Sequence, residues 1–456
     1  DLAKSIVYTR QGNPAWINQN RDGQSGPDRS NDLFFGNASG DPQPDWVNLD
    51  KVAIPQADEQ QQLLTNIIIQ SNLHRKPLPR FWFLPSGKKA AVVMTGDDHA
   101  AGGTIGRFDQ YLTLSGSHNN ATDIADWKAI RGSSYIFPNT PITNAQAAAY
   151  EAQGFEIGVH LNTGCANYTQ SALNSFFATQ LGDMATTFPG ISATSTHRTH
   201  CIAWSGWSVM AAEEFNHGIY LDANYYYWPD TWVQNRPGMF TGSGMPMRFA
   251  TLNGAMIDCY QVATQLTDES GINYTLHINS LLDKATGPEG YYGVFCANMH
   301  TDVNGGTSTA GSDAIIAAAQ AKNIPVISAK QMLTWLDGRN SSAFTNLVWN
   351  NNILTFGIDA NAQARNLKAM LPKRGDSSLV LQSITRNGNA VTFTSETIKG
   401  IEYAFFDAAS GNYTAIYQTV ICTTPTAVLA STSAAVCNGN GPVSIQLSAA
   451  TGAAPY

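Results

Sequence analysis

The sequence predicts an α/β protein whose largest part is a distorted (β/α) barrel, followed by a small all-β sandwich. Between residues 88 and 340, short apolar runs alternate with helical periods, the pattern of β/α units. Several of these runs end in an ionisable residue. After residue 340, apolar and polar residues alternate over short runs separated by turns, as in β-sandwiches.

The composition narrows the class of protein. The 456 residues carry a formal net charge of −8, and only 13% of them are charged. This suits a secreted protein with many loops and argues against a nucleic-acid partner. No apolar run reaches the roughly 18 residues that a membrane span needs, so we expect none.

Residues 1–87 contain turns and one convincing helix, from about Ala57 to Gln70. Four aliphatic residues lie on one face of that helix: Leu63, Leu64, Ile67 and Ile68. The segment carries no catalytic motif. We expect it to pack on the barrel as the remnant of a preceding domain.

The stretch from Ala90 to His99 organises the barrel. It begins as a short, continuously apolar run, which is typical of a buried parallel strand. The run ends in Gly96, Asp97, Asp98 and His99. Adjacent carboxylates repel each other, and polar groups at the end of a buried strand indicate a strand-end active site. A solvated turn is the alternative, because Gly-Asp-Asp is ordinary turn composition.

Later segments repeat this arrangement. A capping box at Thr143 and Gln146 predicts a helix start, and a last strand is expected from Ile324 to Ser328. The ionisable residues at the ends of the intervening strands are His160, Arg198 with His200, Asp222 and His300. Catalytic groups of βα-barrels gather at the carboxyl ends of the strands, so we predict a single site there.

These motifs resemble those of the polysaccharide deacetylases, a carbohydrate esterase family 4-like group with the NodB homology fold. Thr95 to Asp98 is similar to that family's Thr-Phe-Asp-Asp, and Gly154 to His160 to its Gly-His-Glu-Ile-Gly-Asn-His. The remaining matches are Arg198 with its Arg-x-Pro motif, Asp222 and Trp228 with its Asp/Trp motif, and His300 with its Leu-x-x-His motif.

The resemblance implies a metal bound by Asp98 and by two histidines four residues apart. Here the position four after His160 is Gly164, which offers no ligand. Residues two apart in a strand face the same side, so His200 would point into the site with Arg198. We predict Asp98, His160 and His200 as ligands of one divalent ion, preferably zinc. The other candidate metal ligands are His99, His197 and Asn162.

Residue types suggest the chemistry. Asp97 would accept the proton of the attacking water, with Arg198 and the metal keeping it ionised. Protonated His300 would donate to the departing amine, with Asp222 or Asp258 raising its pKa. Aromatic rings suit stacking on sugar faces, and the candidate substrate-binding residues are Trp204, Trp207, Tyr226 and Trp228.

The expected function is therefore metal-dependent removal of acetyl groups, N-acetyl rather than O-acetyl, from an extracellular polysaccharide. The alternative is a catalytically degenerate barrel that serves as a glycan-binding or surface-adhesion module. Gly164 favours this alternative. The intact set of Asp97, Asp98, His160, Arg198 and His300 favours the enzyme.

The C-terminal region completes the predicted organisation. Residues 341–418 are expected to form the β-sandwich, and residues 419–456 a linker and the start of an immunoglobulin-like module, similar to those of bacterial surface proteins. We therefore expect one piece of a longer multidomain chain, secreted by or displayed on a bacterium. A disulfide is predicted between Cys422 and Cys437. A second is expected between Cys165 and Cys201, with free thiols as the alternative.

Overall fold

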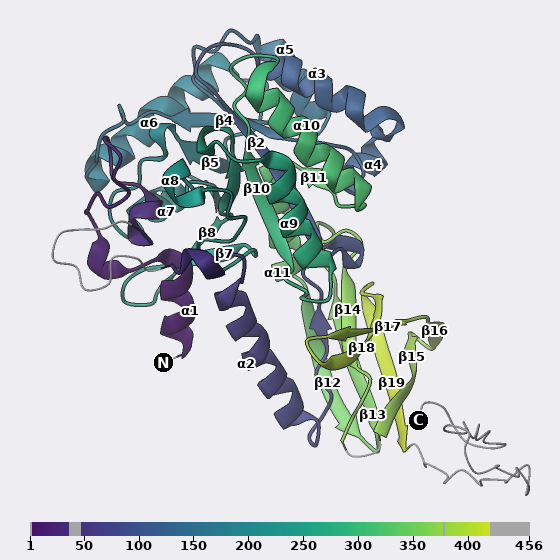
Figure 1. Cartoon of the computed structure of the whole chain (residues 1–456). Helices are drawn as coiled ribbons and strands as arrows, with labels where there is room; N and C mark the ends of the chain where they lie inside the picture. Colours follow the sequence, from purple (N-terminus) through teal and green to yellow (C-terminus); the bar gives the residue numbers. More distant parts are fainter. Residues whose placement is uncertain (1, 36–46, 377–378, 420–456) are drawn as a thin grey trace, which may run out of the picture.

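The computed structural model describes residues 2–35, 47–376 and 379–419 of the chain. They form a mixed α/β body in which a curled, mainly parallel sheet makes a half-barrel with helices around it, and two further β-sheets follow (Figure 1). The predicted fold class, an α/β protein with a distorted (β/α) barrel followed by β-sheets, is confirmed.

The half-barrel is built from ten strands. They are β2 (Ala90–Asp98), β3 (Ser133–Ile136), β4 (Glu156–Leu161), β5 (Thr196–Thr199), β6 (Leu221–Asp222), β7 (Met247–Ala250), β8 (Met256–Gln261), β9 (Thr264–Thr267), β10 (Gly293–Asn298) and β11 (Val326–Ile327). Their order is β7-β8-β6-β5-β4-β3-β2-β10-β9, and β11 also pairs with β2. Every neighbouring pair is parallel except β7 and β8. A bridge between Tyr226 and Thr264 links the chain after β6 to β9, which curls the sheet towards closure.

Most of the helices surround this sheet and follow its strands in the chain, whereas the first two precede it. The described helices are α1 (Leu2–Gln11), α2 (Gln56–Asn72), α3 (Thr104–Ser115), α4 (Ala121–Ala125), α5 (Asn144–Ala152), α6 (Gln170–Thr187), α7 (Val209–Asn216), α8 (Asp230–Val233), α9 (Tyr274–Thr286), α10 (Gly306–Ala321) and α11 (Ala329–Asn340). The predicted capping box starts α5, where the Thr143 hydroxyl accepts from the Gln146 amide. None of the described helices is long and apolar enough to cross a membrane.

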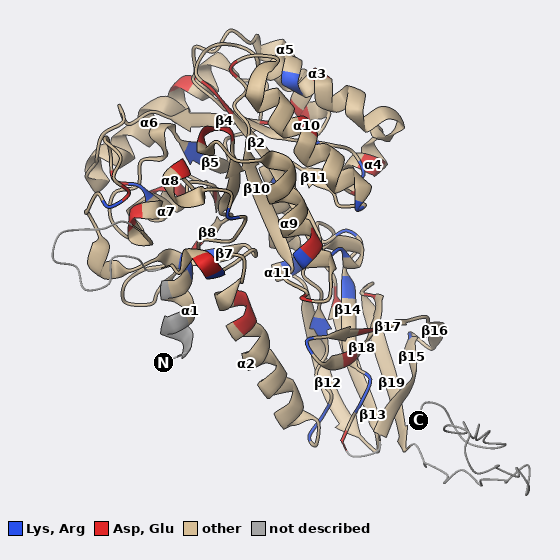
Figure 2. Ribbon diagram, viewed as in Figure 1, with Lys and Arg blue, Asp and Glu red and all other residues tan. Residues whose placement is uncertain are grey.

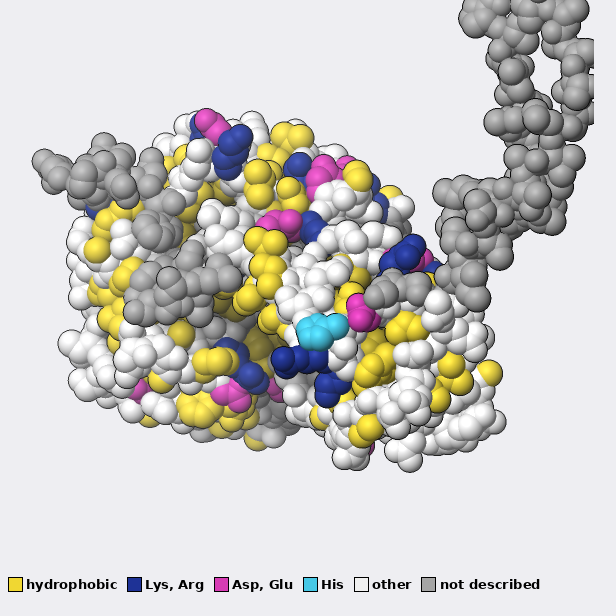
Figure 3. Space-filling model, turned by 90° about the horizontal axis from the view of Figure 1, so that it is seen from below, with side chains coloured by type: hydrophobic (Ala, Val, Ile, Leu, Met, Phe, Trp, Pro, Cys, Tyr) yellow, Lys and Arg dark blue, Asp and Glu magenta, His cyan; other side chains and the backbone are white. Residues whose placement is uncertain are grey.

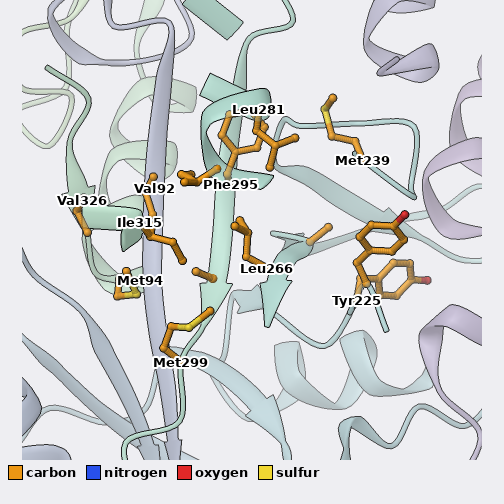
Figure 4. Packing of buried hydrophobic residues seen from close by; sticks show 14 of the residues in the cluster. Val92, Met94, Tyr225, Met239, Leu266, Leu281, Phe295, Met299, Ile315 and Val326 are labelled. Atoms are coloured by element: carbon orange, nitrogen blue, oxygen red, sulfur yellow. The ribbon is translucent and has the colours of Figure 1, made fainter. Parts of the chain in front are cut away.

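The apolar run of β2 is continuous because both faces of the strand are buried. Val92 and Met94 pack into one hydrophobic cluster with residues of β9, β10 and α10 (Figure 4). Ala91 and Val93 pack into a second cluster with α11 and the C-terminal sheets. A parallel strand covered on both sides needs apolar residues at every position, not at alternate ones. The strand therefore emerges from the core only at its carboxyl end.

Two antiparallel sheets form the C-terminal part. One has the order β12-β13-β19-β15-β16 and the other β1-β14-β18-β17. Their strands are β1 (Arg80–Phe81), β12 (Ala343–Asn350), β13 (Ile353–Asp359), β14 (Lys368–Pro372), β15 (Leu379–Arg386), β16 (Asn389–Val391), β17 (Thr394–Ile398), β18 (Ile401–Asp407) and β19 (Gly411–Thr419). The boundaries predicted at residues 87, 340 and 418 stay a prediction. Since β1 pairs with β14, the N-terminal segment also contributes a strand to the C-terminal sheets.

Helix α2 presents its predicted apolar face to solvent. Leu63, Leu64, Ile67 and Ile68 are exposed, whereas Asp58 and Ile69 on the opposite side are buried. Seen from below, apolar side chains are scattered over the visible face among polar and charged ones (Figure 3). Acidic and basic side chains are spread over many separate elements (Figure 2).

Candidate metal centre and active site

A pocket of about 260 Å³ lies at the carboxyl ends of the barrel strands, where the sequence predicts the site. Its walls include Asp97, His99, His160, His200, Tyr226 and His300. A larger cavity of about 450 Å³, beside Trp127 and Trp335, contains no histidine in its described lining.

Three histidines from the ends of three strands converge in the pocket. His99 follows β2, His160 lies in β4, and His200 follows β5. One ligand nitrogen of each ring lies within 4.8 Å of those of the other two. The imidazole rings of His99 and His200 are 4.8 Å apart between centroids, and those of His160 and His200 are 5.3 Å apart.

Neighbouring acceptors fix the tautomers of two of these rings. His160 Nδ1 lies 3.0 Å from the carbonyl oxygen of Arg198, which can only accept, so Nδ1 carries the proton. His99 Nδ1 likewise donates to Asp302, whose Oδ2 is 3.0 Å away. In the neutral forms of both rings, the lone pair is then on Nε2. Burial lowers the pKa of His160 to about 3 and keeps it neutral.

The spacing of the nitrogens fits a tetrahedral divalent ion. His200 Nδ1 lies 3.3 Å from His160 Nε2. Two nitrogens at zinc-bond lengths of about 2.0–2.1 Å lie roughly 3.3–3.4 Å apart along a tetrahedral edge. A carboxylate behind a ligand histidine, as Asp302 lies behind His99, is the usual second-shell partner in such sites. The residues present therefore fit a metal held by His99, His160 and His200.

Asp98 does not belong to this group. Its Oδ1 accepts hydrogen bonds from the amides of Ala101 (2.8 Å) and Gly102 (2.9 Å). Its Oδ2 accepts from the Thr104 amide (3.1 Å) and hydroxyl (2.8 Å). Alternate residues of a strand point to opposite faces, so Asp98 faces the start of α3 while Asp97 and His99 face the pocket. The structure therefore places Asp98 outside the group of candidate ligands, contrary to the prediction.

Replacing Asp98 with alanine is expected to destabilise the fold and to leave metal affinity unchanged. Four hydrogen bonds to a fully buried carboxylate are lost, for which we expect about 2–4 kcal/mol in the free energy of unfolding. Denaturant titration of the variant measures this, with exposed Asp359→Ala as the control, expected within about 0.5 kcal/mol. A metal affinity lowered as far as in His160→Ala would contradict the structural role.

Asp97 lies in the pocket with Arg198 beside it. Arg198 Nη1 is 3.3 Å from Asp97 Oδ1, and Asn298 Nδ2 donates to Oδ2 at 2.8 Å. Burial alone would raise the pKa of Asp97, but chiefly the charge of Arg198, with smaller contributions from the nearby imidazoles, holds it well below its usual value. Asp97 is therefore an ionised proton acceptor beside the histidines.

His300 is held by the carboxylate of Asp268, which no sequence motif indicates. Its Nδ1 donates to Asp268 Oδ1 at 2.8 Å, and its amide donates to Oδ2 at 2.8 Å. Burial lowers the pKa of His300, but the bond to Asp268 and the charge of Asp97 outweigh it and raise the pKa to about 9. His300 is thus a protonated imidazole with Nε2 free to donate.

Asp222 and Asp258 do not perform that role. Asp222 is fully buried behind the pocket, where it accepts from Asn224 and lies in a group with His197 and Glu214. His197 Nδ1 lies 2.6 Å from Glu214, so it faces away from the three-histidine group. Asp258 is half exposed and paired with Arg248. The prediction of Asp222 as a catalytic residue is wrong.

The predicted substrate-binding aromatics divide into two pairs. Trp204 and Trp207 are only 1% and 4% exposed. Trp204 stacks on Phe249, and the Trp207 indole N–H donates to the Ala250 carbonyl, so both belong to the core and their prediction as substrate contacts is wrong. Tyr226 and Trp228 line the pocket, although Tyr226 is also fully buried, and contact of either ring with substrate stays a prediction.

The N-terminal segment contributes to the pocket as well. Arg29 lines it and lies over the Trp228 ring at 4.9 Å. Its Nε donates to the Cys201 carbonyl at 3.3 Å. Cys201 is disulfide-bonded to Cys165, as expected, while the Cys422–Cys437 prediction lies outside the described residues.

The sequence motifs do not assign a role in the site to three of its residues, His99, Asp268 and Asp302. His99 was only an alternative ligand, although its i,i+2 spacing from Asp97 signals a shared face. Asp268 and Asp302 follow β9 and β10, and no motif distinguishes them from other strand-end acids. The Asn162 alternative is exposed, with its side chain accepting from the Gly164 amide 2.7 Å away.

Comparison with known proteins gives structural likenesses only. No family model and no curated protein matches the sequence. A Mycobacterium smegmatis structure described as a polysaccharide deacetylase is 13% identical, covers 56% of this chain and 91% of its own, and has a TM-score of 0.36. A Streptococcus mutans CE4 esterase is 12% identical over 57% of this chain and 89% of its own, with a TM-score of 0.31.

An α-L-fucosidase of Bacteroides thetaiotaomicron is also similar, at 12% identity over 72% of this chain and 93% of its own, with a TM-score of 0.27. Identities and TM-scores this low carry no weight for the reaction, which rests on the residues of the site. Polysaccharide deacetylases, the family that the motifs resemble, are thus among the solved structures to which this chain is similar.

Proposed function

We propose that this protein is a metal-dependent hydrolase that removes acetyl groups, N-acetyl rather than O-acetyl, from an extracellular polysaccharide. The observation that carries the proposal is one pocket in which three metal-ligand imidazoles, an ionised carboxylate and a protonated imidazole converge. A divalent ion held by His99, His160 and His200, preferably zinc, would supply Lewis-acid activation of the acetyl carbonyl.

Asp97 is the proposed general base. It is ionised, lies in the pocket wall, and is fixed by Arg198 and Asn298 on different oxygens. A base that must accept a proton from water needs one carboxylate oxygen within reach of that water and a fixed orientation. Arg198 is fully buried and also bonds Thr95 and Thr264, so it positions Asp97 rigidly.

His300 is the proposed general acid. Its Nδ1 proton is engaged by Asp268, which leaves the Nε2 proton for the leaving group. A departing amine is a poor leaving group unless it is protonated, so an acid that is still charged at neutral pH suits amide cleavage. This supports N-acetyl over O-acetyl groups as the substrate.

The substrate and the location of the protein belong to the same proposal. Trp228, which is partly exposed, offers aromatic surface in the pocket for a sugar ring. The Cys165–Cys201 disulfide supports an oxidising, extracellular or cell-surface setting.

Acetate release from acetylated glycans tests the function. The panel contains N-acetylated chitooligosaccharide and peptidoglycan and O-acetylated xylan, each assayed with zinc, with a chelator, and with zinc restored. We expect release from an N-acetylated member that stops with chelator and returns with zinc. Acetate release that is unchanged by the chelator contradicts the metal site. Glycan binding without any release favours the adhesion module instead.

A further inference from the structure

The disulfide of the pocket wall is placed directly against a proposed metal ligand. Cys201 follows His200 in the chain, and its partner Cys165 lies in the loop after β4. The two sulfurs and one nitrogen of His200 all lie within 4.8 Å of one another. His200 is therefore a member of two potential ligand groups, one with His99 and His160 and one with the two cysteines.

The backbone around both cysteines has a left-handed conformation. Cys165 has φ +51°, Cys201 +58° and Ile202 +47°. Such values are uncommon for residues other than glycine, and for a β-branched residue such as Ile202 they are outliers. These conformations persist only where surrounding contacts hold them. The turn that carries His200 is thus held in place by its neighbours and does not reflect the preference of its own residues.

Two sets of contacts hold this turn. On one side is the disulfide to Cys165. On the other is the N-terminal segment, where Arg29 forms an antiparallel bridge with Ala203 and the Trp204 amide donates to the Asp28 carbonyl at 2.7 Å. Both cysteines are partly exposed, so a small reductant can reach the bond. Cleaving the disulfide would remove one of the two constraints.

We propose that the Cys165–Cys201 disulfide masks a second metal site, made of the two thiolates and His200, which reduction opens in competition with the three-histidine site. A phosphine reductant and water convert the disulfide to two thiols and the phosphine oxide. A divalent ion then replaces the two thiol protons, which are released. Two thiolates and an imidazole are a favourable donor set for zinc or cobalt.

Competition arises because the two sites share one ring. A neutral imidazole has one free lone pair, so His200 can serve only one ion at a time. With the ion on the thiolates, Asp97 and His300 no longer face it in the arrangement of the oxidised pocket. Reduction is therefore expected to lower activity while the protein keeps its metal. The proposal rests on the proposed function only for this loss of activity.

Cobalt(II) spectroscopy on the full chain tests the proposal. The background carries Cys422→Ser and Cys437→Ser, which leaves the buried Cys259 and Cys296 as the other described thiols. The oxidised protein, loaded with one equivalent of cobalt, should lack cobalt–thiolate absorption in the near ultraviolet. Phosphine reduction should produce that absorption, lower acetate release at least about tenfold, and leave bound cobalt unchanged. Reoxidation should remove the absorption and restore acetate release.

The matched control is the further variant Cys165→Ser/Cys201→Ser, which should show no thiolate absorption and no response to reductant. Unchanged absorption after reduction, with free Cys165 and Cys201 verified by alkylation, overturns the proposal. A failure of this proposal can be distinguished from a failure of the proposed function. An oxidised protein that binds no cobalt refutes the three-histidine site, whereas the thiolate signal reports the second site by itself.

Discussion

Replacing His99 with alanine is expected to abolish zinc binding as fully as replacing His160, and Asp98→Asn is expected to retain it. His99 supplies one of three nitrogens that converge in the pocket, whereas both oxygens of Asp98 are engaged by the loop before α3. Loss of an outer-shell partner typically lowers metal affinity about 10- to 100-fold, and loss of a direct ligand exceeds that. Zinc affinity is measured by competition with a chromophoric chelator.

A graded series makes this prediction sharper. Asp302→Asn should weaken zinc binding about 10- to 100-fold, because Asp302 only orients His99 and fixes its tautomer. His197→Ala, in the neighbouring buried group, should leave the affinity unchanged in the folded protein. If His99→Ala binds zinc normally and Asp98→Asn does not, the family's carboxylate ligand is retained and our assignment of the ligands fails.

Asp97→Asn and His300→Ala are each expected to lower kcat by about 100- to 10,000-fold while zinc stays bound. Asp97 is the only carboxylate bonded to Arg198 in the described part of the pocket, and an amide in its place cannot accept the proton. His300→Ala removes the proton donor for the departing amine. Steady-state acetate release, with zinc content determined on the same samples, measures both effects.

Substitution of Asp268 gives a second test of His300 as the general acid. Asp268→Asn keeps a hydrogen-bond acceptor for His300 but removes the charge that raises its pKa. Since the raised pKa keeps His300 protonated up to about pH 9, the variant should lose activity at a lower pH on the alkaline side. An alkaline limb that does not move would show that His300 is not the acid, even where His300→Ala is inactive.

The sequence by itself determined the fold class and the region of the site. Periodicity is a local property, and a strand buried on both faces must be apolar throughout, so β2 and its carboxyl end were recognisable from residues 90–99 alone. For the same reason the ends of β4, β5 and β10 could be predicted to meet. Asp97, Arg198, His160, His200 and His300 were identified in this way, and the structure places them together.

The tertiary structure decided which side chain turns into the pocket and which partner it meets. Asp97 and Asp98 are identical in type and adjacent, yet the pleat sends one to the histidines and the other to the start of α3. Asp222 lies at the carboxyl end of a strand, where Asp97 also lies, but it is buried among His197 and Glu214. Trp204 and Trp207 are rings of the kind that bind sugars, and only their burial shows that they do not face one here.

No sequence pattern indicates the hydrogen-bond partners that come from distant segments of the chain. Asp268 reaches His300 over 32 residues, Asp302 reaches His99 over 203, and Arg29 reaches Cys201 over 172. Each contact depends on how separate strand ends and the N-terminal segment meet in space, and no local pattern encodes that meeting. Site residues that are recognised by their type and by their position at a strand end could therefore be predicted from the sequence. The hydrogen-bond partners that these residues meet across the pocket could be identified only in the folded structure.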